Sequence, residues 1–191
     1  HQFEKAAEHF REAVEFDTTN SSLHRQLTMN LLRAGKIDEA YRSLEKSLLY
    51  FPDEAELNMM VADILVGRKE YERALTHYQR VSQVDPTSPR AYLLQGTVYE
   101  HLNQPNLAVA IYRKITQVEP TNPLGYHYLA RTDILSGRLE EARVHLEQAL
   151  ELRPSLQASR EYLAWVWEKL GNAEEAAKEY RVLLKLDPLN K

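Results

Sequence analysis

Residues 171–188 read GNAEEAAKEYRVLLKLDP, and the pattern of this stretch recurs through the whole chain. Its proline is the last of five that stand 34 residues apart: Pro52, Pro86, Pro120, Pro154 and Pro188. An alanine recurs at the same step, at Ala6, Ala40, Ala74, Ala108, Ala142 and Ala176. Four residues after each alanine comes a large apolar residue: Phe10, Leu44, Tyr78, Tyr112, Leu146 and Tyr180. A strict period of this length predicts an array of short, similar structural units.

The proline column sets the register of the array. With each proline at position 32 of a 34-residue repeat, a half repeat at 1–20 is followed by five full repeats at 21–54, 55–88, 89–122, 123–156 and 157–190. An alanine, a large apolar residue four positions later and then a proline, at period 34, resemble the tetratricopeptide repeat family over the whole chain. The resemblance implies an all-α, right-handed solenoid of antiparallel helix pairs, with eleven helices. We expect residues 1–191 to form one solenoid and to be a piece of a longer protein, because the array starts inside a repeat.

Proline, glycine and capping residues mark the predicted helix ends. Ser88 and Asn122 each precede a proline, an order that favours a helix start because proline's missing N–H needs no partner there. Pro105 fits the same rule at the start of a second helix. Between the two helices of a repeat, the shared position holds Gly35, Lys69, Asn103, Gly137 and Gly171. Glycine and asparagine accept the left-handed backbone of a helix end, and Lys69 is the exception, so Gly67 is an alternative site for that turn.

Small residues mark the predicted close contacts between helices. Position 8 of the repeat holds Thr28, Ala62, Gly96, Ala130 and Ala164, and the alanine column is expected to face it. The fourth repeat departs from the pattern with Asp133 at position 11 and Arg143 at position 21, where the other repeats are uncharged. We predict that these two form a partly buried ion pair, because a lone buried carboxylate is costly. The alternative is a small helix rotation that exposes both to solvent.

No pattern in the sequence indicates catalysis. There is no cysteine, no glycine-rich phosphate loop, no serine in a GxSxG turn and no pair of histidines at metal-binding spacing. We therefore expect a non-enzymatic protein with no cofactor and no metal. No apolar run approaches the roughly 18 residues of a membrane span, so direct membrane insertion is not expected. The sequence leaves a cytoplasmic and a periplasmic location equally open.

The family resemblance implies a concave groove lined by the first helix of each repeat. The lining positions mix apolar residues with about equal numbers of basic and acidic ones, and the net charge is −4, so the basic stripe that nucleic acids require is missing. We expect a protein or peptide partner instead. The predicted contact residues are Arg25, Met29, Met59, Asp63, Arg90, Leu93, Thr97, His127, Tyr128, Arg131, Ile134, Glu161, Tyr162 and Trp165.

The last two repeats supply the strongest candidate within this groove. Tyr128, Tyr162 and Trp165 are predicted to lie close to His127 and Arg131, and Trp, Tyr and Arg are the residues enriched in binding hot spots. His127 could then make binding sensitive to pH. The alternative is that Trp165 packs sideways against neighbours on its own helix and binds nothing.

The predicted function is a non-catalytic scaffold that binds a peptide or helix of a partner and organises a larger complex. An alternative is a substrate-recruiting or regulatory arm of a larger enzyme or of an assembly or secretion machine. The apolar terminal helices also suggest end-to-end self-association, or contact with further repeats. These helices carry Phe3, Phe10, Val14 and Phe16 at one end and Val182, Leu183, Leu184 and Leu186 at the other.

Overall fold

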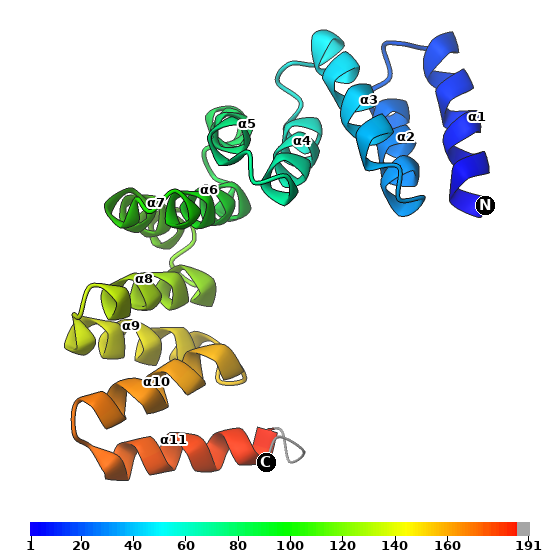
Figure 1. Cartoon of the computed structure of the whole chain (residues 1–191). Helices are drawn as coiled ribbons and strands as arrows, with labels where there is room; N and C mark the ends of the chain where they lie inside the picture. The colour runs from blue at the N-terminus through cyan, green and yellow to red at the C-terminus, as the bar shows by residue number, and fades with distance from the viewer. Residues whose placement is uncertain (187–191) are drawn as a thin grey trace. The chain divides into compact units, whose positions relative to one another are not determined.

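The computed structural model describes residues 1–186, and its helices fall into two compact units. Unit 1 covers residues 1–102 and contains α1 (Gln2–Phe16), α2 (Ser21–Arg33), α3 (Ile37–Tyr50), α4 (Ala55–Gly67), α5 (Tyr71–Val84) and α6 (Pro89–His101). Unit 2 begins at Asn103 and contains α7 (Pro105–Val118), α8 (Pro123–Leu135), α9 (Leu139–Leu152), α10 (Gln157–Lys169) and α11 (Ala173–Leu186), as Figure 1 shows. Over the described residues, the all-α prediction and its eleven helices are confirmed. Pro188 lies outside the described residues.

The helix starts follow from the capping residues. The Ser88 hydroxyl accepts a hydrogen bond from the Ala91 amide at 3.4 Å, and Pro89 is the first residue of α6. The Asn122 side chain caps α8 in the same way, with Oδ1 3.0 Å from the Leu124 amide. These side chains replace the partners that the first amides of a helix lack. The caps predicted at Ser88 and Asn122 are thus confirmed, whereas α2 and α4 use Asn20 and Glu54 as caps, and α10 starts after Leu156 with no side-chain cap.

The turns between the paired helices adopt a left-handed backbone at the predicted position in every repeat. The φ angles are 75° at Gly35, 62° at Lys69, 56° at Asn103, 73° at Gly137 and 80° at Gly171. The alternative at Gly67 is wrong, because that residue is the last of α4 and the turn is made by Lys69 itself. A lysine in this conformation carries a backbone strain that glycine avoids.

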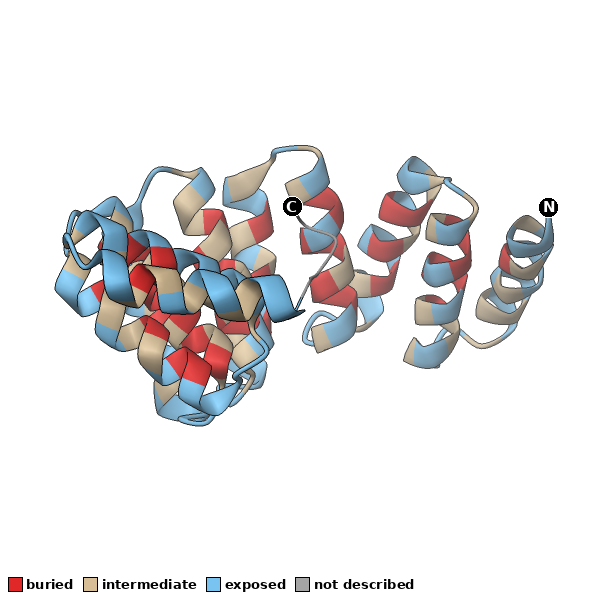
Figure 2. Cartoon of the chain, turned by 90° about the horizontal axis from the view of Figure 1, so that it is seen from below, coloured by how far each residue is buried: buried red, intermediate tan, exposed pale blue. Residues whose placement is uncertain are grey.

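Neighbouring helices in each unit meet through the predicted small residues. Thr28, Ala62, Ala130 and Ala164 are fully buried, as are Ala40, Ala74, Ala108 and Ala142 of the facing column. The larger core residues form one cluster in unit 1 and another in unit 2. Figure 2 shows the buried positions along the faces by which neighbouring helices pack. At the two ends of the described chain, α1 and α11 each bury a single residue, Ala7 and Ala176.

A polar contact that the sequence did not reveal holds the loop before four of the five first helices, α2, α4, α6 and α10. The side chain at repeat position 4 reaches back to the carbonyl oxygen of position 32 in the preceding repeat. The contacts join His24 Nε2 to Thr18 O at 3.2 Å, Asn58 Nδ2 to Pro52 O at 2.9 Å, Tyr92 Oη to Pro86 O at 2.9 Å and Arg160 Nη2 to Pro154 O at 2.8 Å. Because four different side chains make the same bond, no single motif in the sequence marks it.

Candidate functional site

Two of the predicted groove residues in unit 1 serve the packing of the unit itself. Met59 on α4 is 6% exposed and belongs to the core cluster, so its predicted place in the groove is wrong. Asp63 on the same helix accepts a hydrogen bond from the Tyr78 hydroxyl of α5. Burial, and then the bond to Asp63 and its negative charge, raise the pKa of Tyr78, whereas the charge of Arg90 acts in the opposite direction. Asp63 therefore helps to join α4 to α5.

Other predicted groove residues of unit 1 are also engaged. Arg25 on α2 pairs with Glu54 at 3.3 Å, and Glu54 caps the start of α4. The Thr97 hydroxyl donates a hydrogen bond to the Leu94 carbonyl of its own helix at 2.8 Å. Met29, Asp63 and Arg90 are exposed on this face, and Arg25, Leu93 and Thr97 are half-buried.

In unit 2, four predicted residues, His127 among them, come together. The His127 ring lies 5.2 Å from the Tyr128 ring, edge to face, and 5.7 Å from the Tyr162 ring of α10. The Arg131 guanidinium stands 5.0 Å from the centre of the Tyr128 ring. The cluster of His127, Tyr128, Arg131 and Tyr162, here called the α8–α10 aromatic cluster, thus joins two first helices. Trp165 was predicted to lie with them, but its ring contacts Lys169 of its own helix instead.

His127 forms the buried base of this cluster. It is 7% exposed, and its Nδ1 lies 2.8 Å from the Ser159 hydroxyl of α10. Burial, and then the positive charge of Arg131, lower the pKa of His127 to about 4. The ring is therefore neutral near pH 7, which argues against the hypothesis that it makes binding respond to pH in that range.

Tyr162 and Trp165 form the exposed part of the surface. Each is 37% exposed, and their spacing of three residues places them on one face of α10. The Lys169 ammonium lies 5.4 Å from the centre of the Trp165 ring, which matches one of the sideways contacts that the alternative reading allows. Glu161 is exposed beside them, whereas Ile134 of α8 is half-buried against the core of unit 2.

The predicted ion pair between Asp133 and Arg143 is wrong, because each residue pairs with other residues. Asp133 is 6% exposed, as expected, but its carboxylate binds Arg138 at 2.8 Å and His145 Nδ1 at 2.8 Å. Arg143 instead pairs with Glu147 at 2.7 Å and with Glu140 at 3.0 Å. His145 and Arg143 are two residues apart on α9, and side chains at that spacing point to different sides of a helix. The residue that turns toward Asp133 is therefore His145.

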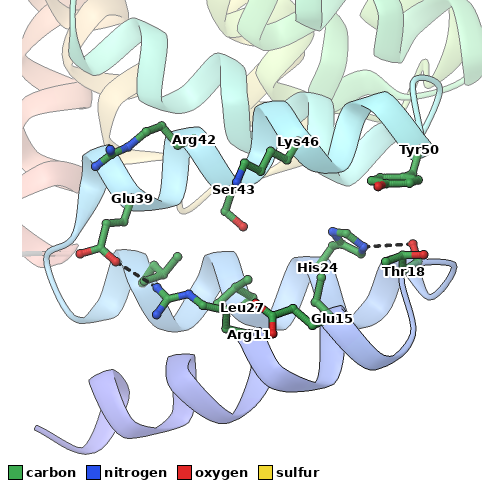
Figure 3. A pocket seen from close by; sticks show the side chains of 12 residues that line it. Arg11, Glu15, Thr18, His24, Leu27, Glu39, Arg42, Ser43, Lys46 and Tyr50 are labelled. Atoms are coloured by element: carbon green, nitrogen blue, oxygen red, sulfur yellow. Dashed lines mark hydrogen bonds and ion pairs between the residues drawn. The ribbon is translucent and has the colours of Figure 1, made fainter.

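The structure also contains a cavity of about 580 Å³ in unit 1 that sequence reasoning missed. It lies between α1 and α3, and α2 forms its floor. Figure 3 shows residues of all three helices around it. One feature of the sequence could have indicated the cavity. The small residues Ser43 and Ser47 stand at repeat positions where the next repeat has the larger His77 and Val81. Within residues 1–186, no group of three or more His, Cys, Asp or Glu side chains is arranged to hold a metal ion. No helix in the same part of the chain is long and apolar enough to cross a membrane.

Comparison with solved structures finds the same fold in several proteins. MamA from Desulfovibrio magneticus RS-1 superimposes with a TM-score of 0.77 at 20% identity, over 89% of this chain and 96% of that one. PilF from Pseudomonas aeruginosa gives 0.79 at 19% identity, over 99% and 86%. YrrB, described as a tetratricopeptide repeat protein with an unusual peptide-binding site, gives 0.74 at 17% identity, over 97% and 95%. At these identities the likeness concerns the fold.

Comparison at the level of sequence identifies the family. No curated protein matches the chain. Three family models match it: a TPR repeat at residues 62–103, and two models described as tetratricopeptide repeat at residues 89–122 and 129–191. The matches agree with the 34-residue period, with the paired helices and with the solved structures of similar fold, and the chain belongs to the tetratricopeptide repeat family.

Proposed function

We propose that this protein is a non-catalytic scaffold that binds a peptide segment or a helix of a partner on the first-helix face of unit 2. The general role, an interaction scaffold, is supported by its membership of the tetratricopeptide repeat family. The observation that carries the specific proposal is the exposed pair Tyr162 and Trp165 beside the α8–α10 aromatic cluster. Organisation of a larger complex follows if the bound segment belongs to another protein.

The physical basis of binding is a rigid apolar surface edged by charge. His127 and Ser159 fix α8 against α10, so the aromatic side chains above them lose little freedom when a partner binds. Tyr162 and Trp165 offer large apolar areas, the kind that dominates the energy of protein interfaces. Arg131, Glu161 and Lys169 add charges of both signs, which would fix the orientation of the bound segment.

A protein partner suits this surface better than a nucleic acid. The chain has a net charge of −4, and Arg131 and Lys169 share the surface with Glu161. Binding to a phosphate backbone relies on several neutralising cations along one path. The mixed charges of unit 2 favour a peptide that itself carries apolar and charged residues.

The test is a photo-crosslink followed by a binding measurement. A benzophenone amino acid in place of Trp165 would capture the partner in an extract of the source cell, and mass spectrometry would identify the attached segment. That segment, synthesised with a fluorophore, is then titrated with the wild type and with the double variant Trp165→Ala, Arg131→Glu. We expect the double variant to weaken binding by about tenfold or more.

A matched control is present on α11. Tyr180 is 38% exposed, close to the 37% of Trp165, and Arg181 is exposed next to it. The variant Tyr180→Ala, Arg181→Glu makes the same types of change outside the proposed surface and should leave the affinity unchanged. Equal weakening by both double variants, or by neither, would reject the first-helix face of unit 2 as the binding site.

Self-association through the terminal helices is a separate part of the proposal. On α1, Phe3 is 42% and Phe16 95% exposed, and on α11 Leu184 is 54% and Leu186 42% exposed. Apolar area of this kind favours contact between molecules. Sedimentation velocity should show association at high concentration that the variant Phe16→Ser, Leu184→Ser reduces. A single monomeric species for the wild type at all concentrations would contradict it.

A further inference from the structure

The cavity of unit 1 lies on a different face from the predicted groove. Its floor is formed by His24, Leu27 and Leu31 of α2, which are spaced three and four residues apart and so share one side of the helix. The predicted groove residues of α2, Arg25 and Met29, lie on another side. The walls of the cavity come from α1 and α3, which are second helices of their repeats. A ligand here would leave free the side of α2 that carries the predicted groove residues Arg25 and Met29.

The α3 wall of the cavity contains a small residue, Ser43, where the next two repeats have larger ones. A corresponding space lies between α3, α4 and α5, but its volume is about 360 Å³ rather than 580 Å³. At the repeat position of Ser43, that second space holds His77, whose Nδ1 lies 2.9 Å from Asn58 Oδ1. The third repeat has Ile111 at this position. Ser43 thus leaves open a volume that lies within the range of about 300–1,000 Å³ found for ligand sites.

Some charged side chains around the cavity have an ion-pair partner among the described residues and others have none. Arg11 of α1 is paired with Glu39 of α3 at 3.0 Å. Lys46 of α3 has no ion pair or hydrogen bond within residues 1–186, and Arg42 uses its Nε on the Asp38 carbonyl at 3.2 Å without a carboxylate partner. Figure 3 shows Lys46 on the α3 wall and Glu15 on the facing α1 wall. The α3 wall therefore presents two cations to a ligand.

The lining between these charges is mostly apolar. Leu27 is 4% and Leu31 1% exposed, and Val14 of α1 adds to the same wall. Tyr50, at the end of α3 and 58% exposed, stands at one end of the cavity near His24, as Figure 3 shows. The floor is apolar and Tyr50 adds an exposed aromatic ring. Among the described residues around the cavity, the unpaired charges are Arg42 and Lys46 on α3 and Glu15 on the facing α1 wall, so the α3 side selects for a ligand that combines an apolar side chain with negative charge.

We propose that this cavity docks an acidic peptide segment of a partner protein, separate from the segment bound by unit 2. A large apolar side chain of the peptide would sit against Leu27 and Leu31, and its carboxylates would pair with Arg42 and Lys46. Glu15 on the facing wall would accept hydrogen bonds from the peptide's amide groups. The scaffold would then hold two segments at once, one on each unit.

The test selects peptides directly on this chain. A phage library of random 12-residue peptides is panned on the wild type and depleted on the variant Ser43→Ile, which narrows the cavity with the residue that the third repeat already uses. We expect the surviving peptides to be enriched in Asp or Glu next to Leu, Phe or Trp. Circular dichroism and thermal unfolding verify that Ser43→Ile keeps the fold. Survivors without acidic enrichment, or no peptide that distinguishes the two proteins, would overturn the proposal.

Charge variants then locate the site. With a fluorescent survivor peptide, Arg42→Glu with Lys46→Glu should weaken binding by about tenfold or more, and added salt should weaken the wild type as well. Arg181→Glu with Lys185→Glu on α11 makes the same change of charge elsewhere and should have little effect. Trp165→Ala should also leave this peptide's affinity unchanged, which separates the cavity from the surface proposed on unit 2. Equal loss in both charge variants would mean non-specific attraction and would reject the site.

Discussion

The helix pairs α4–α5 and α10–α11 occupy the same positions of the repeat, yet their side chains serve different purposes. Asp63 and Trp165 share one position, and Tyr78 and Tyr180 share another. In the first pair Tyr78 is 1% exposed and its hydroxyl holds Asp63, whereas Trp165 and Tyr180 are 37% and 38% exposed. The difference arises from neighbours: α5 packs between α4 and α6, while α10 is the main neighbour of α11. The repeat therefore fixes a side chain's place, and its neighbours decide whether that side chain is structural or available for binding.

The largest expected effect is on the free energy of unfolding at the two tyrosines. Tyr78→Ala removes a buried ring and should cost about 3–5 kcal/mol, as large aromatic deletions do in protein cores. Tyr180→Ala should cost about 1 kcal/mol or less, because the exposed part of its ring loses little on truncation. Urea unfolding followed by circular dichroism measures both.

A third variant separates the ring from its hydrogen bond. Tyr78→Phe keeps the packing and removes only the hydroxyl that binds Asp63, so it should cost about 0.5–1.5 kcal/mol. If Tyr180→Ala were as destabilising as Tyr78→Ala, the distinction between a structural and an available surface would fail.

The next largest expected effect is the pH dependence of the stability of unit 2, which unit 1 lacks at the equivalent position. Met59 holds the position of His127 in the second repeat and cannot titrate, whereas the folded pKa of His127 lies at about 4 against an ordinary 6.5. Because the unfolded chain then binds the extra proton more readily, stability is full above pH 6.5 and falls as the pH drops toward 4. The expected loss is about 2–3 kcal/mol across that window.

Tryptophan fluorescence is the suitable measurement for this prediction. Both tryptophans, Trp165 and Trp167, lie on α10, so their signal reports the unfolding of unit 2. His127→Gln keeps a polar group near Ser159 and should flatten the dependence between pH 6.5 and 4. His101→Gln, an exposed site in unit 1, is the control and should retain it. An unchanged slope in His127→Gln would show that other groups cause the acid sensitivity.

A smaller expected effect on stability distinguishes the contacts of Asp133 in unit 2 from those of Asp63 in unit 1. Asp63 is bound by a neutral hydroxyl, whereas Asp133 is bound by Arg138 and His145. A double-mutant cycle between Asp133→Ala and Arg138→Ala should give a coupling of about 1 kcal/mol, since charged hydrogen bonds are stronger but Arg138 is half exposed to water.

A second double-mutant cycle tests the originally predicted partner, Arg143. Asp133→Ala combined with Arg143→Ala should be additive to within about 0.5 kcal/mol, because these side chains are not in contact. Thermal or urea unfolding of the wild type, the three single variants and the two double variants provides the numbers. A coupling for Arg143 larger than that for Arg138 would restore the original prediction and contradict the structure.

The repeat pattern was enough to predict the helices, the caps at Ser88 and Asn122 and the turns, because those depend on local chemistry that recurs every 34 residues. It also brought together His127, Tyr128, Arg131 and Tyr162, since neighbouring first helices present equivalent positions to each other. It failed at Met59 and at Arg143. In both cases the outcome depends on how far a helix is rotated and on which neighbour fills the space, and a single sequence does not carry that information.

The cavity of unit 1 could not be predicted from the sequence for a related reason. Ser43 differs from His77 and Ile111 at the same position, but a small residue in one repeat can mean a void, a closer helix or a filled gap. Only the packed structure shows that α1 and α3 stay far enough apart to leave about 580 Å³ open. The loop contacts made by His24 and Arg160 were hidden because different side chains perform the same task.

The smallest expected effect concerns the turns of the two compared helix pairs. Lys69 has φ 62° between α4 and α5, and Gly171 has φ 80° between α10 and α11. A side chain at Gly171 would meet nothing within 4 Å, so Gly171→Lys tests the backbone conformation alone. Gly171→Lys should lower the free energy of unfolding by about 1 kcal/mol, and Lys69→Gly should raise it by about 0.5 kcal/mol. The second effect is smaller because glycine also increases the conformational freedom of the unfolded chain. Opposite signs in urea unfolding would confirm that both turns need the left-handed backbone, whereas a loss in Lys69→Gly would mean that the lysine side chain itself contributes to the α4–α5 pair.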